Sequence, residues 1–274
     1  MAVKVRFWGV RGSIATPSPR HIAFGGNTSC IEIRAGNRLL ILDAGTGIRN
    51  LGNQLVKEDL SSFDILLSHT HWDHMNGFPF FTPAYNPACK IRIQAGHLID
   101  QGGLKRVLSG QMTQPMFPVP LEAMNSQMDI EDFRTGETLD LDDGIIVKTT
   151  MLNHPNGATG YRIEYEGRSL CYVTDTEHVP GQPDRNILSL IEGADLVIYD
   201  STYTEEEFPE KVGWGHSTWN EGVKLCQMAG AGSMAIFHHD PEHEDSFMDQ
   251  VEADARSEWE NVFAAREQME VELA

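Results

Sequence analysis

The chain has 274 residues and a formal net charge of −19, from 21 Lys and Arg against 40 Asp and Glu. Its hydrophobic content of 41% is that of a globular protein and excludes wholesale disorder, and no apolar run approaches the roughly 20 residues that span a bilayer. The four scattered cysteines indicate neither a disulfide framework nor a zinc ribbon, so we expect a cytoplasmic protein without a membrane partner.

The first half of the chain is typical of short strands joined by glycine-rich turns. Alternating residues predict a strand over residues 3–8 and a hairpin formed by residues 29–34 and 38–42. Further elements are expected along this half: helices at 46–58 and 104–112, strands at 64–67 and 91–94, and an extended proline-rich loop at 115–120.

Strands and helices alternate in the second half, from residue 138 onward. The expected strands cover residues 145–150, 161–165, 169–173, 196–199 and 234–237, and the expected helices cover 186–192, 219–229 and 245–255. No linker or repeat divides the chain. We therefore predict one domain, residues 1–274, of the α/β class, in which two sheets pack together with helices outside.

Charge is distributed unevenly along the chain. The last 35 residues contain 12 acidic and 2 basic side chains, and we interpret this tail as solvated surface. A net acidic chain binds phosphate backbones poorly, because such binding depends on clusters of Lys and Arg. We therefore expect no long nucleic acid as a partner, whereas a small anionic molecule is compatible with the composition.

A dense group of histidines and aspartates predicts a metal site. His69, His71 and Asp73 are spaced by two, so an extended chain turns all three to one side, and His74 follows at once. Imidazole nitrogens and carboxylates suit zinc, and manganese or iron would also be accepted. Three more candidates each follow a predicted strand: His154, Asp175 and His238.

In this order, these residues resemble the metallo-β-lactamase superfamily of binuclear metal hydrolases. The resemblance implies a four-layer αββα sandwich that holds two divalent metal ions at one edge, zinc in the first place. It assigns the first metal to His69, His71 and His154, the second to Asp73, His74 and His238, and a bridging role to Asp175. His239 is the alternative for the last position, although counting from the strand end favours His238.

A second motif indicates a branch of that superfamily. Gly215-His216-Ser217-Thr218 resembles the Gly-His-Ser-Thr loop of the phosphodiesterase and tRNA 3′-processing endonuclease branch. Asp200 stands where that branch carries Glu, which argues against tRNA processing in particular. The pattern from Thr218 to Glu221 predicts a helix that begins just after His216. Paired with Asp200, His216 would stabilise developing negative charge or protonate a leaving alkoxide.

These observations predict a binuclear metal-dependent hydrolase, foremost a phosphodiesterase acting on a small anionic ester such as a cyclic nucleotide. The expected mechanism is attack by a metal-bridging hydroxide, with Asp73 accepting its proton as well as binding metal. One alternative is a lactone or thioester hydrolase on the same metals. A second is a catalytically silent metal-binding sensory module.

Other residues receive weaker assignments. Arg11 and Asn27 lie in glycine-rich loops that are candidates to border the pocket, which makes both residues candidate substrate contacts. The alternative is that these glycine-rich turns only change the direction of the chain. His178, three residues after Asp175, is a candidate support for the metal ligands. The sequence leaves the natural substrate, the metal in the cell and homo-oligomer formation open.

Overall fold

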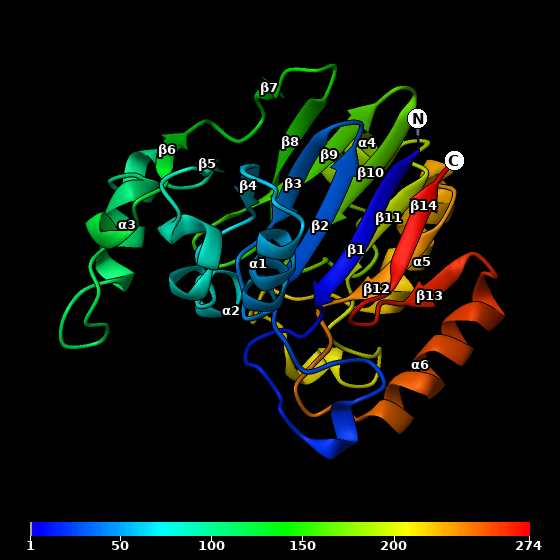
Figure 1. Cartoon of the computed structure of the whole chain (residues 1–274). Coiled ribbons are helices and arrows are strands. Elements are labelled where there is room, and N and C mark those ends of the chain that lie inside the picture. Colours follow the sequence, from blue (N-terminus) through cyan, green and yellow to red (C-terminus); the bar gives the residue numbers. More distant parts are fainter. Residues whose placement is uncertain (1) are drawn as a thin grey trace.

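The computed structural model describes residues 2–274, which fold into two seven-stranded sheets (Figure 1). The first sheet is mixed, with β3 to β6 parallel to one another. Its strands are, in spatial order, β14 (Glu270–Leu273), β1 (Val3–Gly9), β2 (Cys30–Ala35), β3 (Arg38–Leu42), β4 (Ser62–Leu67), β5 (Lys90–Ala95) and β6 (Gln127–Asp132).

The second sheet contains the strands of the second half of the chain. Strands β10 to β13 are parallel, while β9 runs antiparallel to both of its neighbours. In spatial order the strands are β13 (Val262–Ala264), β12 (Met234–Phe237), β11 (Leu196–Asp200), β10 (Arg168–Val173), β9 (Ala158–Tyr165), β8 (Ile146–Leu152) and β7 (Thr138–Asp140).

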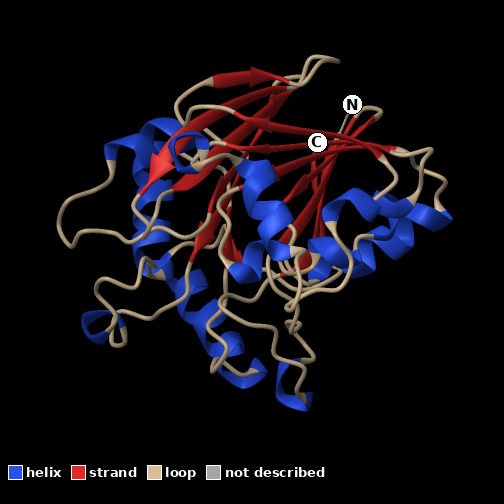
Figure 2. Cartoon of the chain, turned by 90° about the vertical axis from the view of Figure 1, so that its left-hand side faces the viewer, coloured by secondary structure: helices blue, strands red, loops and turns tan. Residues whose placement is uncertain are grey.

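Helices cover the outer face of each sheet, which confirms the predicted αββα architecture. Contacts place α1 (Gly47–Lys57) and α3 (Leu104–Gln111) on the first sheet. The second sheet is covered by α4 (Arg185–Ile191), α5 (Trp219–Ala229) and α6 (Asp245–Glu258). Figure 2 shows that the longer loops gather at one end of the strands. No helix among residues 2–274 is long and apolar enough to cross a membrane.

Three apolar clusters fill the interfaces between these layers. The central cluster lies between the sheets and includes Phe7, Ile31, Tyr161 and Phe237, all with no exposed surface. The other two join each sheet to its own helices. Burying one such large side chain stabilises the fold by about 1.5–3 kcal/mol. The two sheets therefore form a rigid base for the loops at their edge.

Most predicted elements agree with the structure to within a few residues, and the proline-rich loop is confirmed. The prediction misses the short helix α2 (Trp72–Met75) and strands β6, β7, β13 and β14. Within the acidic tail, β14 pairs with β1 at the sheet edge, and its glutamate side chains remain exposed. Lys4 Nζ lies 3.5 Å from Glu270 Oε1 and 3.7 Å from Glu272 Oε2, so opposite charges flank this pairing.

Candidate metal centre

The predicted ligands meet because their strands end at one edge of the two sheets. His69 to His74 follow β4, and Asp175 and His238 follow the parallel strands β10 and β12. Strand β8, which precedes His154, runs in the same direction as β10 because β9 is antiparallel to both. Chain segments more than a hundred residues apart thus bring their side chains to one place.

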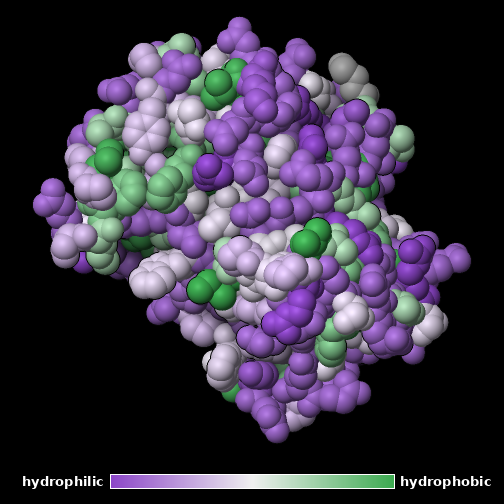
Figure 3. Space-filling view, turned by 60° about the horizontal axis from the view of Figure 1, so that its bottom comes forward, coloured by the Kyte–Doolittle hydropathy of each residue, from purple (hydrophilic) through white to green (hydrophobic). Residues whose placement is uncertain are grey.

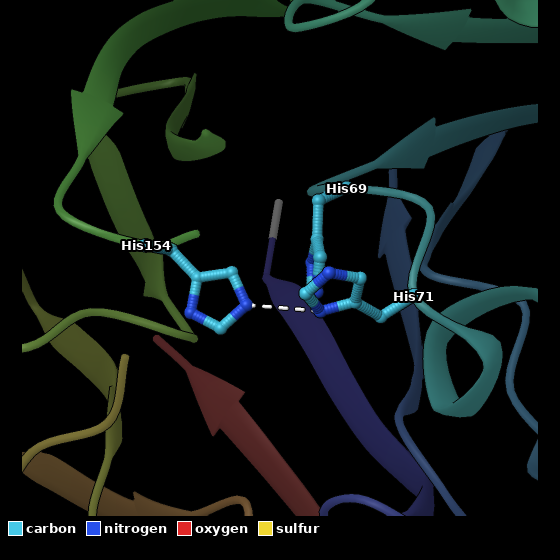
Figure 4. Close-up of side chains that lie close together, drawn as sticks. All are labelled: His69, His71 and His154. Atoms are coloured by element: carbon cyan, nitrogen blue, oxygen red, sulfur yellow. Dashed lines mark hydrogen bonds between the residues drawn. The ribbon is translucent and has the colours of Figure 1, made fainter. Parts of the chain in front are cut away.

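The first group of ligand atoms comes from His69, His71 and His154, whose nitrogens lie within 4.8 Å of one another. His71 Nδ1 is 3.0 Å from His154 Nε2. Figure 4 shows the rings of His69 and His71 on one side and the ring of His154 facing them from the other. Three converging imidazole nitrogens are a suitable donor set for a zinc-like cation.

The second group consists of Asp73, His74, Asp175 and His238, all buried, with ligand atoms within 4.8 Å of one another. His238 Nε2 is 3.2 Å from both His74 Nε2 and Asp73 Oδ2. His239 points elsewhere, because its Nε2 lies 2.9 Å from the carbonyl oxygen of Ala265. Of the two neighbouring histidines, His238 is therefore the one that turns its ring toward this group.

Asp175 lies between the two groups. Its Oδ1 is 3.2 Å from His74 Nε2 and 3.4 Å from His238 Nε2. Its Oδ2 is 3.6 Å from His69 Nε2 and 3.7 Å from His154 Nε2. One carboxylate oxygen thus faces each group, which is the arrangement needed for a shared ligand.

In three of the ligand imidazoles, Nδ1 faces a hydrogen-bond acceptor, while Nε2 points toward the centre. Asp43 Oδ2 lies 2.7 Å from His74 Nδ1, the Gly215 carbonyl oxygen 2.8 Å from His154 Nδ1, and Thr202 Oγ1 2.9 Å from His238 Nδ1. An acceptor at Nδ1 keeps the proton there and leaves Nε2 with a free lone pair.

His69 provides a further test of whether the residues fit a metal. Its Nε2 is buried and has no hydrogen-bond partner, which costs free energy unless a ligand occupies that direction. Burial lowers the pKa of His69, which favours the neutral, metal-binding imidazole. These residues fit a bound cation.

The electrostatics of the second group also favour a cation. Burial lowers the pKa of His74, but the carboxylates of Asp175, Asp73 and Asp43 outweigh burial and raise this pKa well above its ordinary value. Several carboxylates converge here in a site that is almost closed to solvent. Such a site stabilises positive charge, whether it is a proton or a metal ion.

A third combination joins this centre to the Gly-His-Ser-Thr loop. Asp200 Oδ2 lies 3.0 Å from His216 Nδ1, and the His216 ring stacks on His238 with ring centroids 4.9 Å apart. Asp200, His216, Asp175 and His238 also offer atoms within 4.8 Å of one another. The Asp200 carboxylate already accepts the backbone N–H groups of Thr176 and Thr202, at 3.0 and 3.1 Å, so its oxygens are engaged.

Asp200 determines the protonation of His216. Burial lowers the pKa of His216, but the Asp200 carboxylate and the more distant Asp175 and Asp73 outweigh it and raise the pKa to about 9. Helix α5 begins at Trp219, just after this loop, and Glu221 N donates to Thr218 Oγ1 at 3.2 Å. The predicted helix start is confirmed.

Comparison with known families shows the superfamily to which this chain belongs. The family described as "Beta-lactamase superfamily domain" matches residues 37–239, which is most of the chain. The chain belongs to the β-lactamase superfamily. This superfamily protein is 24% identical over 286 residues to a ribonuclease Z of Haloarcula marismortui, covering 87% of this chain and 86% of that protein.

Solved structures share the fold of this β-lactamase-superfamily chain. The metallo-β-lactamase fold protein YhfI of Bacillus subtilis superposes with a TM-score of 0.76 at 17% identity, with 99% of each chain covered. Human tRNase Z, short form, superposes with a TM-score of 0.69 at 20% identity, with 98% of each chain covered. Both comparisons support the αββα architecture.

Two residues that we expected to contact substrate have their side chains bound within the superfamily chain itself. Arg11 has no exposed surface, and its Nε and Nη1 donate to the carbonyl oxygens of Gly25 and His243 at 2.8 and 2.7 Å. Asn27 Nδ2 donates to Glu267 Oε2 at 3.0 Å. Through His243 and Glu267, the two side chains tie the N-terminal loop to the C-terminal part of the chain.

His178 lies beside the centre without contacting a candidate ligand. Its Nδ1 is 2.8 Å from Ser217 Oγ, and its ring stacks on Phe208 with centroids 4.1 Å apart. It therefore supports the loop that carries His216. The expectation that His178 supports the metal ligands themselves finds no direct contact in this structure.

Sequence reasoning assigned no role to Asp43, which holds one of the ligands. Asp43 accepts from Ser68 N at 2.7 Å and from the Tyr172 hydroxyl at 2.7 Å, besides its contact with His74. Tyr172 belongs to the second sheet, so Asp43 joins both sheets beneath the centre. An aspartate directly after the strand that ends at Leu42 was the available signal, since strand ends at this edge carry the other site residues.

The backbone at the centre is unusual at three strand ends. Asp43, Asp175 and His238 have φ angles of +60°, +51° and +63°, a region that residues with side chains seldom adopt. Such conformations persist where the surrounding structure holds them, and they are concentrated at functional sites. Here each directs a polar side chain into the space between the sheets.

Two glycines allow close approach to the ligand rings. A Cβ atom on Gly12 would lie 2.3 Å from His238 Cε1, and a Cβ on Gly215 would lie 2.4 Å from His154 Nδ1. Neither distance is compatible with a side chain unless the ring moves. One glycine therefore supports each of the two ligand groups.

Proposed function

We propose that this protein is a binuclear metal-dependent phosphodiesterase. The observation that carries the proposal is the Asp200–His216 pair, placed beside two groups of ligand atoms that share Asp175. A metal-binding sensor needs no protonated imidazole next to its metals. A thioester hydrolase has less need of one, because a thiolate is a better leaving group than an alkoxide.

We assign the two metals to the residues expected from the sequence. His69, His71 and His154 would hold the first, Asp73, His74 and His238 the second, and Asp175 both. Five imidazoles and two carboxylates favour zinc, with manganese or iron as alternatives. When bound, two such cations supply a nucleophile from water at neutral pH and neutralise the phosphoryl oxygens.

Two side chains of the protein itself can donate and accept the protons that the reaction moves. With Nδ1 held by Asp200, His216 retains its other proton on Nε2, from which it can protonate the leaving oxygen. The Asp200 carboxylate favours the protonated form of this imidazole and raises its pKa. Asp73 is the candidate proton acceptor, and its Oδ2 is oriented by the N–H of Ser13 at 2.7 Å.

A small anionic ester is the proposed substrate, with a cyclic nucleotide as the example. The net charge of −19 disfavours a long phosphate backbone laid across the surface. A relative named ribonuclease Z supports phosphodiester chemistry and makes RNA the competing substrate. A precursor tRNA with a 3′ trailer therefore belongs in the same assay.

The test compares four substrates on protein loaded with zinc or manganese: bis(4-nitrophenyl) phosphate, a 2′,3′-cyclic nucleotide, the precursor tRNA and an acyl lactone. We expect turnover of the first two. Faster cleavage of the tRNA would reassign the substrate to long RNA. Lactone turnover without phosphodiester turnover would refute the proposal, and so would a fully metal-loaded protein that hydrolyses none of the four.

Replacing His216 by Ala tests the proton-transfer role. General acid catalysis contributes about 10²–10⁴-fold, so kcat for a phosphodiester with an alkoxide leaving group should fall by about that factor. The metal content should stay at the wild-type value. His178→Ala is the matched control, because His178 contacts the same loop without touching the ligands. Equal kcat values for His216→Ala and wild type would show that the assigned role is wrong.

A further inference from the structure

Two tryptophans beside the metal centre leave most of their surface exposed. Trp72 is 80% exposed and Trp214 is 61% exposed, whereas Trp8 and Trp219 are buried and Trp259 is half-buried. Burying a large ring against the protein's own core would have stabilised the fold. On the face where the loops gather, apolar side chains interrupt a mainly hydrophilic surface (Figure 3).

Both tryptophans flank the first group of ligands. Trp72 stands between His71 and Asp73 in the sequence, after a strand of the first sheet. Trp214 precedes Gly215, whose carbonyl oxygen lies 2.8 Å from His154 Nδ1 on the side of the second sheet. Since the facing nitrogens of His71 and His154 are 3.0 Å apart, the backbones that carry the two tryptophans reach this group from opposite sheets.

The backbones that carry these rings are fixed. The N–H groups of Gly213 and Gly215, on either side of Trp214, both donate to Glu177 Oε2, at 2.7 and 2.9 Å. Trp72 begins α2, and its carbonyl oxygen accepts from Asn76 N at 2.7 Å. A ring on a fixed backbone binds a ligand with a small loss of conformational entropy.

A positive charge accompanies Trp214. Lys211 Nζ lies 4.6 Å from the centroid of the Trp214 ring, within the range of a cation–π contact. This contact occupies one face of the ring, and the 61% exposure leaves the rest open to a ligand. A planar group on Trp214 would therefore have a cation close by for an attached phosphate.

We propose that Trp72 and Trp214 form an aromatic rim that stacks on the nucleobase of a nucleotide phosphodiester substrate. This inference rests on the proposed phosphodiesterase activity and narrows its substrate class. Indole rings stack on any base, because every base has a π face. The rim therefore selects nucleotide esters over esters that lack a base, without selecting one base.

Two substrates with the same leaving group test the rim. Thymidine 5′-(4-nitrophenyl phosphate) carries a base, and methyl 4-nitrophenyl phosphate does not. We expect Trp72→Ala and Trp214→Ala each to raise KM for the thymidine ester about tenfold, as base stacking predicts, with little change for the methyl ester. Trp72→Phe and Trp214→Phe should restore most of the loss. Met228→Ala is the matched control, since Met228 is 56% exposed at the far end of α5.

A binding measurement separates this inference from the proposed function. Calorimetric titration of the metal-loaded proteins with thymidine 5′-monophosphate and with ribose 5-phosphate requires no turnover. The rim predicts that both Trp→Ala variants weaken binding of the first ligand and leave that of the second unchanged. Turnover of neither ester by wild type would refute the proposed function, and the titration would still decide the rim. Equal effects on both ligands or both esters would overturn the rim.

Discussion

At the scale of single residues, the centre depends on side chains that fix the ligand imidazoles. Asp43 holds His74 Nδ1 at 2.7 Å and also accepts from the Tyr172 hydroxyl at 2.7 Å. Its φ of +60° shows that the fold holds this residue in an unfavourable backbone conformation. Asp43 therefore contributes to the centre although it is not itself a candidate ligand.

Asp43→Asn should weaken metal binding. The amide removes the negative charge and one acceptor that keep the proton on His74 Nδ1, and changes of this kind cost about 10–100-fold in metal affinity. Competition for zinc with a chromophoric chelator measures this. Tyr172→Phe is the control, because it removes one hydroxyl from the same carboxylate oxygen and should change affinity much less. Unchanged zinc affinity in Asp43→Asn would contradict the account.

The two supporting glycines give a pair of matched variants. Gly12→Ala should displace the His238 ring and weaken the second metal, whereas Gly215→Ala should displace the His154 ring and weaken the first. Cobalt-substituted protein reports the two sites through their absorption spectra. Each variant should lose the signal of one site and keep the other. Loss of the same signal in both would show that the two glycines do not act on separate sites.

At the scale of elements, the sequence predicts the strands that carry ligands better than it predicts the strands at the edges of the sheets. A run such as His69 to His74 shows its spacing directly, and hydrophobic strands before Asp175 and His238 locate their ends. Strand β14 is short and carries Glu270 and Glu272, so its pairing with β1 depends on a partner far away in the chain. The inward direction of Arg11 likewise depends on distant carbonyl groups.

The edge strand β14 should stabilise the whole fold. Val271 packs against the central core and Leu273 is buried in it, so deleting residues 270–274 exposes the outer edge of β1 and removes apolar burial. We expect a loss of about 2–4 kcal/mol in the free energy of unfolding, from one to two buried apolar side chains. Denaturant unfolding measures it. The double substitution Glu270→Gln and Glu272→Gln, which affects only exposed ion pairs, should cost less than about 1 kcal/mol. Equal losses would contradict the packing argument.

At the scale of the whole molecule, the acidic surface and the metal centre differ in how they act on an anionic substrate. The chain carries −19, yet carboxylates of Asp43, Asp73 and Asp175 converge on a site that favours cations. Two divalent cations there would make the pocket attractive to a phosphate while the surface repels long polyanions. This contrast favours a small phosphodiester, and composition alone does not reveal it.

The proposed function requires two metal ions that act together on a phosphodiester. Zinc titration into metal-free protein, with metal content and bis(4-nitrophenyl) phosphate hydrolysis followed in the same samples, tests this most directly. We predict that hydrolysis rises until two zinc ions are bound per chain and then stops rising. Full hydrolysis by the metal-free protein, or no hydrolysis after two ions are bound, would contradict the account.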